Sequence, residues 1–320
     1  MLLGIEIGGT KLQLALGQAD GHLHASWRST IAPELGAAGI LAQLRTQIPK
    51  FCGDHNLDFR KLQAIGIGFG GPVDIATGNV IVSHQVGGWE HFTLIEWVQQ
   101  HFEVPASLGN DADVAGLAEA TIGAGRGCES VFYITMGSGV GGGYVLQQKL
   151  VAGTGRGAAE IGHLQVLDPR YDDCRESTIE GIASGWGIQR YLREQVKRDP
   201  MAGNCLLLLA GTPEQLDTKI LAQALTQSDP FAWQLWKKTL QGFCKGICTV
   251  IALLCPHRIV IGGGVSLLGE ELLFAPLRVV VDKTVFPPFR GLTEIVPAHL
   301  GEEVVLHGAL ELASQVRSAA

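Results

Sequence analysis

Apolar and polar residues follow two different spacings along this chain, and the spacing changes from one segment to the next. Residues 2–7 are almost wholly apolar and residues 12–17 alternate apolar with polar side chains, which is typical of two strands in a hairpin. Ile40, Leu44 and Ile48 instead recur at helical spacing. Up to residue 111, these patterns predict strands at 2–7, 12–17, 62–69 and 104–108 and helices at 36–52 and 94–102. Strands that alternate with helices in this way predict an α/β layer domain.

The second part of the chain continues in the same manner. Small residues from position 112 onward predict a helix, and an irregular stretch is expected at residues 151–173. The patterns further predict strands at 131–136, 144–146 and 258–261 and helices at 179–197, 206–227, 231–254 and 304–316. We expect the last helix to pack back on the first domain.

Three glycine-rich turns follow apolar strands, at residues 8–9, 137–143 and 262–264. Glycine allows turns too tight for residues with a Cβ, which frees backbone amides to face an anion such as phosphate. A plain hairpin turn is the alternative for each turn taken alone. The first two turns, however, share one scheme, in which a strand leads to glycines, a hydroxyl residue (Thr10 or Ser138) and a returning strand. This repetition predicts a duplicated domain whose halves face each other across a cleft.

Composition narrows the class of protein. The chain has 320 residues, 46% of them hydrophobic and 17% charged, so we expect two domains with substantial cores rather than a disordered chain. A net charge of -7 without clusters of Lys and Arg argues against a nucleic-acid surface. The N-terminus lacks an export signal and the longest apolar run is too short to span a bilayer, so no membrane partner is expected.

The 7 cysteines are scattered and show neither a zinc-ribbon spacing nor a disulfide framework. A reducing, cytoplasmic location fits this pattern best. Cys244 and Cys248 stand one helical turn apart in an apolar stretch, where core packing is favoured over metal binding.

Several ionisable residues stand where they could carry chemistry. Glu6 lies inside the first strand, and because burying an unpaired carboxylate is costly, we expect a cation or ordered water beside it. Asp111 stands where a strand meets a helix, and it could act as a base or simply cap the helix. Glu160 and His163 would share one face if their turn is helical, whereas a surface glutamate and a packed histidine are the alternative.

Nine motifs in this order span essentially the whole chain: GIEIGGTK, GFGGPVD, GGW, NDADVAGLAEA, MGSGVGGG, AAEIGH, TIEGIASG, VIGGGVS and LHGALELA. Together they resemble the ROK family of sugar kinases, which includes bacterial glucokinases, fructokinases and acetylamino-sugar kinases. The resemblance implies an α/β fold of two ribonuclease-H-like, actin-like ATPase domains that flank a central cleft. We place the N-terminal domain at residues 1–111, completed by the C-terminal helix at 303–320, and the larger domain at 112–302.

The resemblance also implies roles for individual residues. Asp111 corresponds to the catalytic base, which accepts the proton of the attacking sugar hydroxyl. The sugar would be bound by Asp111 itself together with Gly71, Asn110, Glu160, His163 and Glu180. ATP would be bound by the three glycine turns, through Gly8, Gly9, Thr10, Lys11, Gly137, Ser138, Gly139, Gly262 and Gly263. Mg²⁺ would bridge the phosphates, with Glu6 as the nearest acid.

The chain departs from the family pattern at three places. Glu6 replaces a commoner aspartate, and Ser138 replaces the threonine of a commoner Gly-Thr-Gly turn. Many members also bind a structural zinc through a histidine and three cysteines, whereas the run YDDCREST offers only Cys174. Because a closed zinc site needs four ligands, we predict no structural zinc, and the loop at residues 168–178 must be held by other contacts.

The leading hypothesis is therefore an ATP-dependent hexose kinase of the glucokinase type, with in-line phosphoryl transfer. One alternative is a sugar-binding regulator of the same family, although the first motif begins at Gly4 and leaves no room for an N-terminal DNA-binding domain. A degenerate member that binds sugar without transferring phosphate is the other alternative. The sequence leaves open the sugar, the choice between ATP and polyphosphate, and the homodimer that the resemblance implies.

Overall fold

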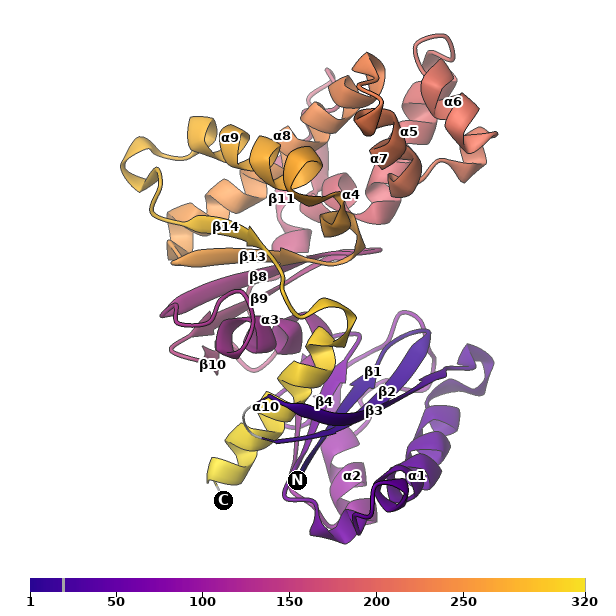
Figure 1. Ribbon diagram of the computed structural model, residues 1–320, viewed down its shortest axis with the longest axis vertical. Helices are drawn as coiled ribbons and strands as arrows, with labels where there is room; N and C mark the ends of the chain where they lie inside the picture. The colour runs from indigo at the N-terminus through magenta and orange to yellow at the C-terminus, as the bar shows by residue number, and fades with distance from the viewer. Residues whose placement is uncertain (19–20, 320) are drawn as a thin grey trace. The chain divides into compact units, whose positions relative to one another are not determined.

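The computed structural model describes residues 1–18 and 21–319, and the chain divides into two compact units (Figure 1). The first unit comprises Met1–Tyr133, Gly143–Ala158 and His299–Ala320, and the second comprises Ile134–Gly142 and Ala159–Ala298. Helix α3 (Asp111–Thr121) belongs to the first unit because it packs against helix α10 (Val304–Ala319) of the same unit. A domain boundary after residue 111 stays a prediction.

The first unit is built on a five-stranded sheet in the order β3-β2-β1-β4-β7. β1, β2 and β3 are antiparallel neighbours, whereas β4 and β7 extend the sheet parallel to β1. β1 and β4 are buried along their whole length, in agreement with their apolar runs. The strands are β1 (Leu2–Ile7), β2 (Lys11–Gly17), β3 (Leu23–Thr30), β4 (Ile65–Phe69) and β7 (Ala106–Asn110).

Helices cover both faces of this sheet, and alternate residues of β1 face one layer or the other. Ile5 joins the core formed with α1 (Gly36–Asp54) and α2 (Leu94–Phe102). Leu2 instead packs against Leu310 of α10. Figure 1 shows α1 and α2 on one side of the sheet and α10 on the other. Burial on both faces explains why the parallel strands read as continuous apolar runs.

Helix α10 lies very close to its neighbours because glycines stand at the contacts. A Cβ on Gly66 of β4 would stand 1.8 Å from the carbonyl oxygen of Ala309, and a Cβ on Gly308 would stand 1.9 Å from that of Val114 in α3. Any side chain larger than hydrogen is therefore excluded at both positions. The expectation that the last helix packs back on the first part of the chain is confirmed.

The second sheet has the order β10-β9-β8-β13-β14, in which β13 and β14 are parallel and β9 and β10 antiparallel neighbours. Its strands are β8 (Ser130–Met136), β9 (Val140–Leu146), β10 (Lys149–Leu150), β13 (Arg258–Gly262) and β14 (Glu294–Pro297). Two short antiparallel ladders lie outside the two sheets: β5 (Val73–Asp74) with β6 (Asn79–Val80), and β11 (Gln165–Leu167) with β12 (Glu176–Thr178).

Helices of the second unit pack on this sheet and on one another. Helices α8 (Pro230–Leu254) and α9 (Ala275–Thr284) lie over β13 and β14 (Figure 1). Arg278 Nε of α9 donates to the carbonyl oxygen of Ile295 in β14 at 2.8 Å. Helix α8, predicted at 231–254, begins at Pro230, and the side chain of Asp229 caps it.

The prediction of one continuous helix at 206–227 is wrong. The stretch contains two helices, α6 (Asn204–Ala210) and α7 (Thr218–Thr226). Gly211 adopts a φ of 80°, which ends α6, and a short 3₁₀ turn beginning at Pro213 precedes α7. The apolar spacing continues across this turn and therefore could not show the interruption.

The predicted helix at 179–197 is likewise two helices, α4 (Ile179–Ala183) and α5 (Gly185–Arg198). Ser184 between them has an extended backbone, and its hydroxyl accepts a hydrogen bond from the Gly187 amide at 3.0 Å. The patterns also did not predict β3, β14 or α9; β3, for example, is an edge strand whose residues are only half-buried or exposed. Across residues 1–18 and 21–319, no helix combines the length and apolar character needed to cross a membrane.

Candidate active site

The first glycine turn joins β1 to β2 and places a cation beside a buried acid. Gly8 closes the turn by donating its amide to the carbonyl oxygen of Lys11 at 3.0 Å. Glu6 is only 4% exposed, and its Oε1 lies 2.8 Å from Lys11 Nζ while its Oε2 accepts from Gln13 Nε2 at 2.6 Å. Of the cation or ordered water expected beside Glu6, the structure therefore shows a cation, the Lys11 ammonium. The predicted contact of Glu6 with magnesium stays a prediction.

Asn110 and Asp111 occupy the junction between β7 and α3, and both side chains accept a hydrogen bond from the Ala112 amide. Asn110 caps the helix, because its Oδ1 accepts from the Ala112 amide at 2.9 Å, while its Nδ2 donates to the carbonyl oxygen of Gly71 at 3.0 Å. Asp111 is the first residue of α3, and its Oδ1 lies 2.8 Å from the Ala112 amide. The capping role weighed for Asp111 thus belongs mainly to Asn110.

The carboxylate of Asp111 lies beside two glycine turns of the first unit. A Cβ on Gly70 would stand 3.5 Å from Asp111 Oδ2 and 3.4 Å from the Cα of Gly8. The chain can bring Gly8, Gly70 and Asp111 together because β1, β4 and β7 are parallel neighbours that end at the same edge of the sheet. The structure therefore groups the predicted base, the first glycine turn and the Gly70-Gly71 turn.

The second and third glycine turns meet in the second unit. Gly137 closes its turn by donating its amide to the carbonyl oxygen of Gly139 at 2.9 Å. Gly263 follows Gly262 at the end of β13 with a φ of 85°, and a Cβ there would stand 2.5 Å from the carbonyl oxygen of Met136. Only glycine can therefore occupy position 263 with β13 packed so closely on the end of β8.

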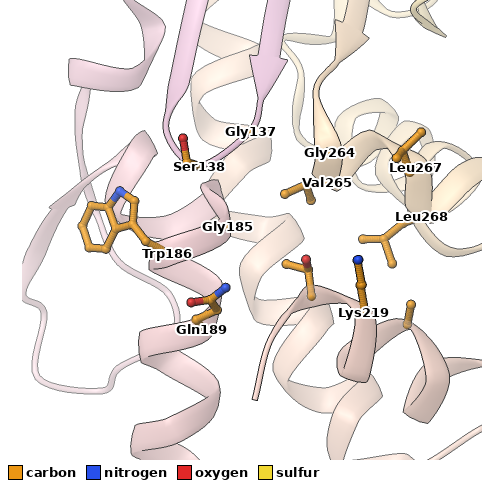
Figure 2. A pocket seen from close by; sticks show the side chains of 12 residues that line it. Gly137, Ser138, Gly185, Trp186, Gln189, Lys219, Gly264, Val265, Leu267 and Leu268 are labelled. Carbon is orange, nitrogen blue, oxygen red and sulfur yellow. The ribbon is translucent and has the colours of Figure 1, made fainter. Parts of the chain in front are cut away.

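A pocket of about 610 Å³ opens beside these two turns (Figure 2). Figure 2 shows Gln189 of α5 and Lys219 of α7 pointing towards the space next to Ser138 and Val265. The pocket is lined by Gly137, Ser138, Gly185, Trp186, Gln189, Thr218, Lys219, Ala222, Gly264, Val265, Leu267 and Leu268. Its mixture of glycine amides, one ammonium, one amide side chain and apolar walls suits a phosphorylated ligand with a flat apolar part.

Helices α5 and α7 also line this pocket, and none of the site residues predicted from the sequence lies on them. Lys219 stands in the first turn of α7, where the helix dipole disfavours a cation, and this position was a usable signal. A single helix predicted at 206–227 hides this signal, because α7 and its Asp217 cap begin inside that range.

Glu160, His163 and Glu180 form a polar group in the second unit. Glu160 precedes a 3₁₀ turn, Ile161–His163, which packs directly on β9, since a Cβ on Gly162 would stand 2.0 Å from the carbonyl oxygen of Val140. Glu180 Oε2 accepts from the Val140 amide at 3.0 Å. The side chain of His163 is exposed, so the packed-histidine alternative is wrong.

Desolvation and, to a smaller extent, the charges of this group shift the pKa of Glu160. Its side chain reaches the surface, but neighbouring atoms remove part of the carboxylate from water, and this desolvation raises the pKa of Glu160. His163 opposes the shift and the Glu180 carboxylate adds to it. A perturbed carboxylate such as that of Glu160, beside an imidazole and a glycine turn, is typical of ligand sites.

The loop at 168–178 is held by ion pairs and ring contacts. Arg170 pairs with Asp168 at 2.7 Å in the interior, and Arg175 pairs with Asp173 at 2.5 Å on the surface. The Tyr171 hydroxyl donates to Glu194 of α5 at 2.6 Å. In the part of the chain that the structure describes, no three His, Cys, Asp or Glu residues are grouped to hold a metal ion. The lack of a structural zinc stays a prediction.

The predicted site residues thus form two groups, each described within its own unit. The first unit holds Glu6, Gly8, Gly9, Thr10, Lys11, Gly71, Asn110 and Asp111, and the second holds Gly137, Ser138, Gly139, Glu160, His163, Glu180, Gly262 and Gly263. Within each group the parts meet at strand ends, as expected for ligand sites on α/β sheets.

Comparison with known proteins agrees with this geometry. A sequence model of the ROK family matches residues 2–316. The chain belongs to the ROK family. A glucokinase from Thermotoga maritima is 30% identical over 314 residues, covering 97% of this chain and 96% of the relative. An N-acetylmannosamine kinase from Escherichia coli is 29% identical and covers 97% of each chain.

A solved ROK structure shows the same fold. The crystal structure of a ROK family glucokinase from Streptomyces griseus, in complex with glucose and AMPPNP, matches with a TM-score of 0.76 and 29% identity. The match covers 98% of this chain and 99% of the other. The predicted α/β class and actin-like ATPase fold are confirmed by this likeness and by the two five-stranded sheets.

Proposed function

We propose that this ROK protein is a kinase that transfers the terminal phosphoryl group of ATP to a hydroxyl of a hexose, with Asp111 as the general base. The observation that carries the proposal is the position of Asp111 Oδ2, next to Gly70 and the Gly8 turn at the edge of the first sheet. A base in that position could accept the proton of a sugar hydroxyl as it attacks a phosphate bound at the glycine turns. Relatives named glucokinase support the reaction class.

The pocket of the second unit is proposed to hold the nucleotide. Phosphates would bind at the Gly137-Ser138-Gly139 amides and the nucleoside near Gly262-Gly263, with the Lys219 ammonium at the rim. The volume of about 610 Å³ is in the range of pockets for ligands of this size. The AMPPNP complex of the Streptomyces griseus enzyme supports ATP as donor.

Magnesium would neutralise charge on the phosphates. Both oxygens of Glu6 already have partners in Lys11 and Gln13, and the described residues hold no cage of three acidic or imidazole ligands. This donor set fits an ion carried mainly by phosphates and water, which is how magnesium usually binds in kinases.

The residues proposed to contact the sugar are Gly71, Asn110, Asp111, Glu160, His163 and Glu180. Carboxylates and an imidazole can accept and donate hydrogen bonds to neighbouring hydroxyls. Glucose or a close relative is the leading substrate, and an acetylamino hexose is the next to test because of the N-acetylmannosamine kinase relative.

Release of ADP, followed over a panel of hexoses and acetylamino hexoses with ATP and Mg²⁺, tests the reaction. We expect one or a few sugars to support turnover and polyphosphate to be the weaker donor. Asp111→Asn should lower kcat by at least about 1000-fold while calorimetry still detects sugar binding, because only the base is lost. Retained turnover in this variant would refute the role of Asp111.

A sugar-binding protein without phosphoryl transfer is the second candidate. The ion pair between Lys11 and Glu6 favours this candidate. In the proposed kinase the Lys11 ammonium would contact phosphate, whereas in the structure it contacts the Glu6 carboxylate. A sugar-dependent shift in melting temperature without ADP release for any sugar would favour it.

A homodimer and a cytoplasmic location remain predictions. Sedimentation analysis would test the homodimer.

A further inference from the structure

We propose that Arg170, paired with Asp168, is a positioning residue that holds helix α4 and thereby sets the place of the Glu180 carboxylate. The inference rests on the proposed function only for its kinetic readout. Its physical basis lies wholly within the second unit, in contacts that join the loop at 168–178 to the helices α4 and α5.

Arg170 is buried and uses every donor of its guanidinium group. Its side chain is 0% exposed and that of Asp168 is 1% exposed. Nε donates to both carboxylate oxygens of Asp168, and Nη2 donates to Asp168 Oδ2 at 2.7 Å. The remaining donors reach three carbonyl oxygens, those of Gly181 at 2.9 Å, Ile182 at 3.2 Å and Gly187 at 3.4 Å. The ring of Tyr191 closes the site, with its centroid 4.9 Å from the guanidinium carbon.

The positions of these carbonyl oxygens show that the guanidinium group joins the end of α4 to the start of α5. Gly181 and Ile182 belong to the last turn of α4, whose carbonyl groups have no partners within the helix. Gly187 lies in the first turn of α5, beyond the Ser184 junction. A helix of five residues does not persist without tertiary contacts, so α4 depends on groups such as Arg170 for its position. The helix dipole also stabilises a cation at the C-terminal end of the helix.

Helix α4 carries Glu180, which connects Arg170 to the proposed site. Glu180 Oε2 accepts the Val140 amide at the end of the second glycine turn, and a Cβ on Gly139 would stand 2.5 Å from the same oxygen. The Glu180 carboxylate therefore has little room to move. Arg170 holds α4, and α4 in turn places this carboxylate against Val140 and Gly139. A buried ion pair adds little net stability over apolar packing, so a pair with this many directed contacts is better explained by position than by stability.

The test compares Arg170→Lys with Arg175→Lys. Lysine keeps the charge but cannot form the fork that reaches Asp168 and the carbonyl groups together. Arg175 is the matched control, because it belongs to the same loop and pairs with Asp173 at the surface. We expect Arg170→Lys to raise the KM for the hexose about tenfold or more, since small displacements of a binding group have effects of this size. The KM for ATP should change less than about twofold, and Arg175→Lys should change neither constant by more than this.

Hydrogen exchange followed by mass spectrometry provides a readout that needs no activity. Arg170→Lys should accelerate exchange in peptides covering residues 137–142 and 179–187, and Arg175→Lys should not. If the wild-type protein phosphorylates no sugar, the proposed function fails while exchange still decides the inference. An unchanged hexose KM in active Arg170→Lys, or unchanged exchange at 137–142, would overturn it. Asp168→Asn, expected to act in the same direction, replaces Arg170→Lys if that variant does not fold.

Discussion

At the scale of single residues, a buried charge is the feature of the proposed site that the sequence already indicates. The sequence already required a partner for Glu6, because an unpaired carboxylate in a strand is costly. The hairpin supplies two, since Gln13 lies directly opposite Glu6 in the β1–β2 register and Lys11 reaches it from the turn. The charge of the turn that is proposed to meet phosphate is therefore balanced before any ligand binds.

Lys11→Met should destabilise the protein because it leaves the Glu6 carboxylate buried without its cation. Since Lys11 is 29% exposed, we expect a loss of about 1–3 kcal/mol in the free energy of unfolding, measured by urea denaturation. The double variant Glu6→Gln with Lys11→Met should recover most of this loss. If the double variant is no more stable than the single one, the pairing is not what stabilises the turn.

The raised pKa of Glu160 makes a prediction about pH. The folded state binds this proton more tightly than the unfolded chain, so the contribution of Glu160 to stability is fully present below its ordinary pKa of 4.5 and is lost as pH rises through the raised value. Glu160→Gln, which cannot ionise, should therefore raise the melting temperature relative to wild type more at about pH 7.5 than at about pH 4.

Calorimetric scans at the two pH values check this expectation. Glu176→Gln, a change at an exposed glutamate of β12, is the matched control and should show no such difference between them. A melting-temperature difference for Glu160→Gln that is equal at both pH values would contradict the assigned shift.

At the scale of elements, close approach decides how the helices pack. The pattern of residues 304–316 predicted a helix, but the distance of α10 from β4 and α3 depends on Gly66 and Gly308. The existence of most helices and strands thus followed from local periodicity, although β3, β14 and α9 did not. The interruptions at Ser184 and Gly211 did not, because they depend on backbone conformations that an apolar pattern does not record.

Gly66→Ala should displace α10, because the new Cβ would overlap the Ala309 carbonyl oxygen at 1.8 Å. We expect a loss of about 3 kcal/mol or more in the free energy of unfolding, measured by urea denaturation. Gly53→Ala is the control, since no atom lies within 4 Å of its added Cβ and the residue is in α1, where alanine is favoured by about 1 kcal/mol. Equal stability of the two variants would argue against close packing of α10.

At the scale of the whole molecule, the comparisons and the two sheets agree on a ROK protein with an actin-like fold. Most of the nine motifs that carried the resemblance contain a turn, a cap or a strand end beside buried residues, whereas LHGALELA lies within α10. They were readable in the sequence because such positions restrict the residue type locally: a glycine where no Cβ fits, or an Asn-Asp pair where a strand passes into a helix.

The amino-acid sequence by itself determined most of the helices and strands, the three glycine turns, the family and the need for a partner at Glu6. The tertiary structure alone decided that Lys11 and Gln13 are these partners, that Asn110 rather than Asp111 caps α3, and that Lys219 lines the pocket beside Ser138. It also decided that the Asp168 and Arg170 pair holds α4. The physical reason is range: periodicity and turn chemistry act between near neighbours in the chain, whereas ion pairs and pocket walls join residues that only the fold brings together.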